Sequence, residues 1–138
     1  MQMTRRTFTV VTAAATCGCA LGGCASMGGG DVQPHDVDAG PADRFSKPGV
    51  YDAYRKDGFF VVNDGSTTFA LSSKCTHRGC TVKKEEDSSF HCPCHGSEFD
   101  STGHVTEGPA KRDLPRYASS TNSAGHLIVQ VGTMANPA

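Results

Sequence analysis

Two short segments rich in cysteine and histidine constrain this chain of 138 residues more than any other feature. The first box is CTHRGC at residues 75–80, and the second is CPCHGS at residues 92–97. Each offers one thiolate and one imidazole at short spacing and carries one further cysteine. Iron–sulfur clusters and zinc both accept this ligand set. The sequence therefore predicts a metal or cluster site built from two loops that lie close together.

A cluster with mixed ligands explains the pattern best. In a Rieske centre two histidines replace two cysteines on one iron of a 2Fe-2S cluster, which raises its reduction potential. Such a site needs one Cys and one His from each of two loops, and both boxes supply that set. The boxes resemble the Rieske iron–sulfur family, in its disulfide-containing exported type, and the resemblance extends over about residues 48–131. It implies that Cys75 and Cys92 hold one iron, that His77 and His95 hold the other, and that Cys80 and Cys94 form a disulfide.

Two other uses of the same residues remain open at this stage. Two Cys and two His could form a tetrahedral zinc site, although structural zinc sites usually use wider spacings. The four box cysteines could instead form two disulfides, as in many small exported domains. That second alternative leaves both histidine-bearing loops unexplained.

The resemblance also implies roles for residues around the boxes. Ser97 matches the serine whose hydroxyl donates to a bridging sulfide, and Gly108-Pro109-Ala110 matches the loop that covers the cluster. An ordinary turn explains that proline equally well. Phe99 stands where high-potential members usually have Tyr, and Arg78 stands where subunits of cytochrome bc-type complexes usually have an apolar Leu. Quinol oxidation is therefore the less favoured function.

The N-terminus resembles an export signal rather than part of a fold. Arg5 and Arg6 match the twin-arginine motif, whose pathway carries proteins already folded with their cofactor, and Leu21-Gly22-Gly23-Cys24 resembles a lipobox. An ordinary secretory signal and an uncleaved anchor helix are the alternatives, although a span needs about 20 strongly apolar residues. We expect an exported protein on the periplasmic side of the cytoplasmic membrane of a bacterial cell envelope. Lipidation at Cys24 or the N-terminal segment would tether it to that membrane.

Composition divides the chain into three parts. We expect residues 1–23 to be the export signal, residues 24–47, which are rich in Gly, Asp and Pro, to be a flexible linker, and residues 48–138 to be the domain that resembles the Rieske family. Short apolar runs separated by turn residues predict an all-β antiparallel sandwich, with a small cluster-binding subdomain formed by two loops. We expect hairpins that turn at residues 63–66 and 85–88 and a closing strand over residues 127–131.

The predicted function is one-electron transfer in a respiratory or oxidoreductase chain. The sequence shows no second iron site for oxygen activation and no nucleotide-binding loop. Residues 24–138 carry eleven Lys and Arg against fourteen Asp and Glu, so nothing favours nucleic acid as a partner. The expected partners are redox proteins such as a c-type cytochrome or a cytochrome b subunit. Alternatives are a quinol-oxidising Rieske subunit of a cytochrome bc-type complex and a non-redox zinc or disulfide module.

Overall fold

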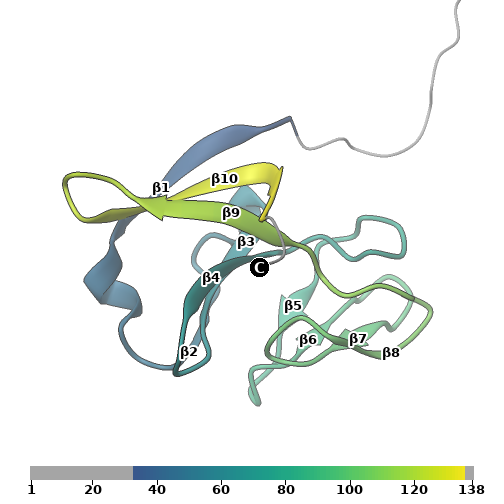
Figure 1. Ribbon diagram of the computed structural model, residues 1–138. Coiled ribbons are helices and arrows are strands. Elements are labelled where there is room, and N and C mark those ends of the chain that lie inside the picture. Colours follow the sequence, from purple (N-terminus) through teal and green to yellow (C-terminus); the bar gives the residue numbers. More distant parts are fainter. Residues whose placement is uncertain (1–32, 136–138) are drawn as a thin grey trace, which may run out of the picture.

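The computed structural model describes residues 33–135, which form two antiparallel β-sheets (Figure 1). The large sheet has six strands in the order β1-β10-β9-β4-β3-β2, and the small sheet has four in the order β5-β6-β7-β8. The elements are β1 (His35–Pro41), η1 (Ala42–Phe45), β2 (Gly49–Tyr51), η2 (Arg55–Asp57), β3 (Phe59–Asn63), β4 (Thr68–Ser72), β5 (Lys83–Lys84), β6 (Phe90–His91), β7 (Glu98–Phe99), β8 (Val105–Glu107), β9 (Arg116–Thr121) and β10 (His126–Met134), where η denotes a short 3-10 helix. The all-β prediction is confirmed.

The β3–β4 hairpin supplies both hydrophobic cores. Side chains alternate between the two faces of a strand. Phe59 and Val61 therefore enter one core, while Phe60 and Val62 enter the other. The first core is formed by side chains from β1, β3, β4, β9 and β10 together with Phe45. The second core joins the large sheet to the small one and includes Leu71, Val82, Phe90, Phe99 and both buried box cysteines. Burial on both faces explains why β3 is apolar from Phe59 to Val62.

The flexible linker predicted for residues 24–47 is wrong in its C-terminal part, because that part is folded. Residues 35–41 form β1, an edge strand of the large sheet that pairs with β10 from His35 opposite Val131 onward. Ala39 is fully buried, and Phe45 of the following helix is only 3% exposed. The composition suggested a solvated tether, but pairing with β10 satisfies the backbone, and the few apolar side chains face the core. The folded domain therefore begins well before residue 48.

The small sheet carries both boxes. Its β5–β6 hairpin pairs Lys84 with Phe90 and turns at residues 85–88, as the sequence predicted. The first box precedes β5 and the second follows β6, so this hairpin fixes the separation of the two boxes. The hairpin at residues 63–66 and the closing strand, as part of β10, are also confirmed.

Within residues 33–135, no helix has the length and hydropathy of a membrane span. Three positions with predicted N-terminal roles lie outside the described residues: Arg5, Arg6 and Cys24.

Candidate metal centre

The two boxes adopt the same backbone turn. In the first, the Cys75 N–H donates to the Cys80 carbonyl at 2.7 Å, and the Gly79 N–H donates to the Cys75 carbonyl at 2.8 Å. In the second, the Cys92 N–H donates to the Ser97 carbonyl at 2.8 Å, and the Gly96 N–H donates to the Cys92 carbonyl at 2.9 Å. The glycines have φ values of 75° and 80°, a region that side chains with a Cβ rarely adopt. The boxes thus form two equivalent loops.

The first cysteine of each box is a buried thiol. Cys75 is 2% exposed, Cys92 is 1% exposed, and neither forms a disulfide. Burial raises the pKa of the Cys92 thiol, backbone N–H groups of Cys94 and His95 oppose that effect, and the neighbouring Cys75 thiol raises the pKa further. The buried Cys92 thiol therefore resists ionisation unless a cation compensates its charge. This environment fits a bound metal cluster.

The two box histidines face each other. The ring centroids of His77 and His95 lie 4.8 Å apart at an interplanar angle of 83°. The Nδ1 atom of His77 is buried and has no hydrogen-bond partner. Desolvation lowers the pKa of His77, and the neighbouring His95 and Arg78 lower it further. A buried ring nitrogen without a partner is costly, and metal coordination would satisfy it.

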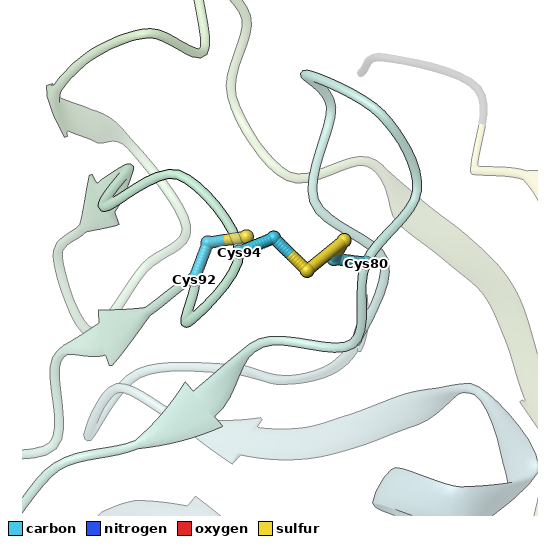
Figure 2. A group of neighbouring side chains, drawn as sticks. All are labelled: Cys80, Cys92 and Cys94. Carbon is cyan, nitrogen blue, oxygen red and sulfur yellow. A yellow bond between two sulfur atoms is a disulfide. The ribbon is translucent and has the colours of Figure 1, made fainter.

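A disulfide joins the two loops, as predicted. Cys80 and Cys94 are bonded across a separation of 14 residues. The sulfurs of Cys80, Cys92 and Cys94 all lie within 4.8 Å of one another (Figure 2). Because two of the three form the bridge, only Cys92 retains a thiol in this group. The bridge therefore lies directly beside one candidate ligand, and the arrangement with two box disulfides is wrong.

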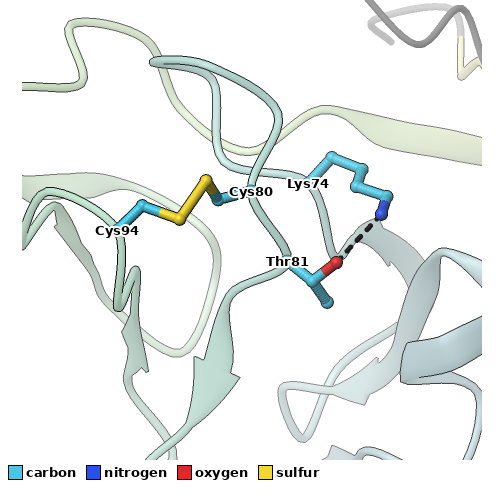
Figure 3. The surroundings of a disulfide bond; sticks show 4 residues. All are labelled: Lys74, Cys80, Thr81 and Cys94. Atoms are coloured by element: carbon cyan, nitrogen blue, oxygen red, sulfur yellow. Dashed lines mark hydrogen bonds between the residues drawn. A yellow bond between two sulfur atoms is a disulfide. The ribbon is translucent and has the colours of Figure 1, made fainter.

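A hydrogen bond continues from the bridge toward the large sheet. The residue after Cys80 is Thr81, whose Oγ1 accepts from Lys74 Nζ at 2.9 Å (Figure 3). Lys74 and Thr81 also form a β-bridge. Together these contacts close the base of the first loop.

A third loop packs against both boxes. The Ala110 N–H donates to the buried Ser97 Oγ at 3.0 Å, and Thr76 Oγ1 donates to the Arg112 carbonyl at 2.6 Å. Pro109 lies in this loop and is exposed. Ser97 accepts this bond with its oxygen, so its own proton remains available to another acceptor. No sequence pattern indicated the contact of Thr76, because its partner is a backbone carbonyl distant in sequence.

Phe99 lies in the second core with Cys75 and Cys92, and it is fully buried opposite Phe90. Three further histidines contact carboxylates rather than the boxes: His91 lies beside Glu98, His104 beside Asp113 and His126 beside Asp38.

Comparison with known proteins identifies the family. The model of the Rieske [2Fe-2S] domain matches residues 33–118. Over 76 residues the chain is 38% identical to the cytochrome b6-f complex iron–sulfur subunit of Chlorobaculum thiosulfatiphilum, covering 54% of this chain and 42% of that protein. Over 61 residues it is 46% identical to a Rieske protein assigned to a respiratory nitrate reductase of Haloferax mediterranei, covering 43% of this chain and 28% of that protein. The matches therefore span less than half the length of these relatives.

A solved structure also matches. The plasma membrane Rieske protein of Synechocystis PCC 6803 is 32% identical, with a TM-score of 0.48, covering 67% of this chain and 97% of that one. The cofactor implied by the domain match is a Rieske-type 2Fe-2S cluster. The match to the family model begins at residue 33, which agrees with the early start of the folded domain. This chain belongs to the Rieske [2Fe-2S] domain family.

Proposed function

We propose that this protein is a one-electron carrier in a respiratory or oxidoreductase chain. The observation that carries the proposal is the pair of equivalent loops, which present two buried thiols and two facing imidazoles. When bound, a 2Fe-2S cluster with two Cys and two His ligands takes up and releases one electron at a higher potential than an all-cysteine cluster. Cys75 and Cys92 would hold one iron, and His77 and His95 would hold the other.

The surrounding residues position these ligands and exclude water from the thiols. The Cys80–Cys94 disulfide ties the two loops together, and the third loop binds both through Ser97 and Thr76. Pro109 would shield the site in that loop. His95 lies at the exposed edge, so an electron partner can approach it closely. The buried thiols and the exposed histidine give the site an inner and an outer side.

Substitution of the four ligands tests this assignment. Alanine at Cys75, His77, Cys92 or His95 should abolish binding of two irons and two labile sulfides per chain. His91→Ala is the matched control, because His91 adjoins Cys92 but lies beside Glu98. It should retain full iron and sulfide. Full cluster occupancy in Cys92→Ala or His95→Ala would refute the ligand assignment.

Export and tethering complete the proposal. Arg5 and Arg6 would direct the folded protein through the twin-arginine pathway, and Cys24 would carry a lipid on the periplasmic side of the membrane. Replacing both arginines by Lys should leave the protein in the cytoplasm. Cys24→Ala should instead release exported protein from the membrane fraction. Export of the double-lysine variant at the normal rate would contradict the assignment.

The relatives' names favour a second candidate, a subunit of a quinol-oxidising complex with a cytochrome b partner. Arg78 argues against it, because a charged guanidinium at the tip is poorly suited to contact an apolar quinol ring. We therefore favour a protein partner such as a c-type cytochrome. Steady-state oxidation of a quinol in membranes, lost on deletion of this protein, would instead support the second candidate.

A further inference from the structure

Three basic residues lie in the two loops that adjoin the exposed edge of the candidate site. Arg78 is in the first box, next to His77, and Lys111 and Arg112 are in the third loop; all three side chains are exposed. The bond from Thr76 Oγ1 to the Arg112 carbonyl holds the two loops together. We call Arg78, Lys111 and Arg112 the cationic collar.

The collar is not neutralised by acidic neighbours. Every ion pair found among residues 33–135 has a histidine as its cation, and none includes a collar residue. Asp113 follows the collar in sequence, but its carboxylate accepts from the Val105 N–H and contacts the His104 ring. The collar charges are therefore available to an external partner.

The turn of the β5–β6 hairpin, at the end of the hairpin away from the boxes, is acidic. Glu85, Glu86 and Asp87 form this turn and line a shallow hollow together with Glu98. The chain after residue 23 has more acidic than basic residues, so positive charge at the tip opposes the overall balance. This polarity favours one orientation of a charged partner.

We propose that the cationic collar docks a protein redox partner that has a carboxylate-rich face around its own redox group. This inference rests on the proposed electron-carrier function, because such a partner must approach the exposed edge of His95. Attraction at the collar and repulsion at the acidic turn would bring that edge toward the partner. A neutral quinol would gain nothing from this charge, and a lipid surface bound at the collar would cover the edge through which electrons leave.

Two forms of one acceptor provide the test. The full-length, cluster-loaded protein is reduced and then oxidised by horse-heart cytochrome c, which is basic, or by the same cytochrome with its lysines succinylated, which is acidic. Rate constants are measured from low to high ionic strength. Oxidation by the succinylated form should slow by about tenfold or more as salt is added, whereas oxidation by the native form should accelerate.

Charge reversal locates the effect. Arg78→Glu/Lys111→Glu should invert both salt dependences while iron, sulfide and the visible spectrum stay unchanged. Arg44→Glu/Lys47→Glu is the matched control, because it reverses two exposed charges near η1, on the opposite side of the large sheet from the small sheet (Figure 1). It should behave as the unaltered protein does.

The outcomes separate this inference from the function on which it rests. An unaltered protein that binds no cluster refutes the electron-carrier function and the docking proposal together. A loaded protein whose rates are independent of salt, or whose collar variant matches the control, refutes the docking proposal alone. Collar-dependent binding to phosphatidylglycerol vesicles with salt-independent rates would assign the collar to a lipid surface and also overturn it.

Discussion

Removing the Cys80–Cys94 disulfide should destabilise the protein without removing an iron ligand. The bridge closes a loop across 14 residues, and a cross-link of that length stabilises the folded state by about 3 kcal/mol through the entropy of the unfolded chain. For a domain of this size, that loss corresponds to a fall in Tm of about 12–24 °C. The site should also lose its cluster faster, because the two loops would no longer be tied together.

The double variant Cys80→Ser/Cys94→Ser is the appropriate form. A single substitution would leave a thiol within 4.8 Å of the Cys92 sulfur, where a new bridge could consume a ligand. Thermal unfolding of the cluster-loaded protein, followed by far-UV circular dichroism at one scan rate, measures Tm. Loss of visible absorbance at constant temperature measures cluster release.

A double alanine variant provides the control for side-chain chemistry. Serine and alanine pairs should show the same loss, because the cross-link itself is what both remove. Unchanged Tm and unchanged cluster release in both variants would show that the bridge neither stabilises the fold nor retains the cluster. A large difference between the two pairs would show that local contacts, rather than the cross-link, determine the effect.

Three further predictions concern the body and the core beside the site. Gly103→Ala should lower the free energy of unfolding by about 2–4 kcal/mol, because φ is 88° and a Cβ would lie 2.6 Å from a buried leucine methyl group. Gly125→Ala is the control: φ is 79° there, but no neighbour lies within 4 Å of the added Cβ, so the cost should be only about 1–2 kcal/mol. Urea unfolding measures both values. The hydrogen bond from the His126 ring lowers the pKa of Asp38. The stabilisation that the carboxylate provides is therefore present above its ordinary pKa of 3.8 and is lost as pH falls through the lowered value. The urea midpoints of Asp38→Asn and of the unaltered protein should converge in acid, and a gap that persists there would contradict this. Phe99→Tyr places a hydroxyl beside the buried cysteines, where it could donate a hydrogen bond to a ligand sulfur. The midpoint potential, measured by protein-film voltammetry, should rise by some tens of millivolts, on the order of 1 kcal/mol for one electron. An unchanged or lower potential would show that the hydroxyl does not reach a ligand sulfur.

The local elements were predictable from the sequence. The β3–β4 hairpin follows from two apolar runs around Asn63-Asp64-Gly65-Ser66, where the Asp64 carboxylate accepts from the N–H groups of Ser66 and Thr67. The two boxes and their bridge followed from a specific motif. For the hairpin and for each box, the information lies within a few residues of the structure that it determines.

Long-range pairing was the part that the sequence did not reveal. β1 has acidic residues, a glycine and a proline, and only its partnership with β10 makes it a strand. Likewise, the Tyr54 hydroxyl donates to the Ala39 carbonyl at 2.6 Å across 15 residues and fixes this segment to the sheet. Composition cannot predict contacts that depend on a distant partner.

The same distinction applies to the site. Residue types and spacing predicted the candidate ligands, but the third loop meets the boxes through backbone groups of Ala110 and Arg112, which no side-chain pattern encodes. The collar likewise emerges only when the loops are placed side by side. The tertiary arrangement thus adds the electrostatic character of the tip to the ligand set that the boxes predict.

Metal and sulfide analysis of anaerobically purified protein is the direct test of whether the boxes hold a 2Fe-2S cluster. We expect two irons and two acid-labile sulfides per chain, a red-brown colour, and, after reduction, an electron paramagnetic resonance signal with the low average g-value of a cluster that has mixed His and Cys ligands. Stoichiometric zinc without labile sulfide, in protein from its native host, would contradict it.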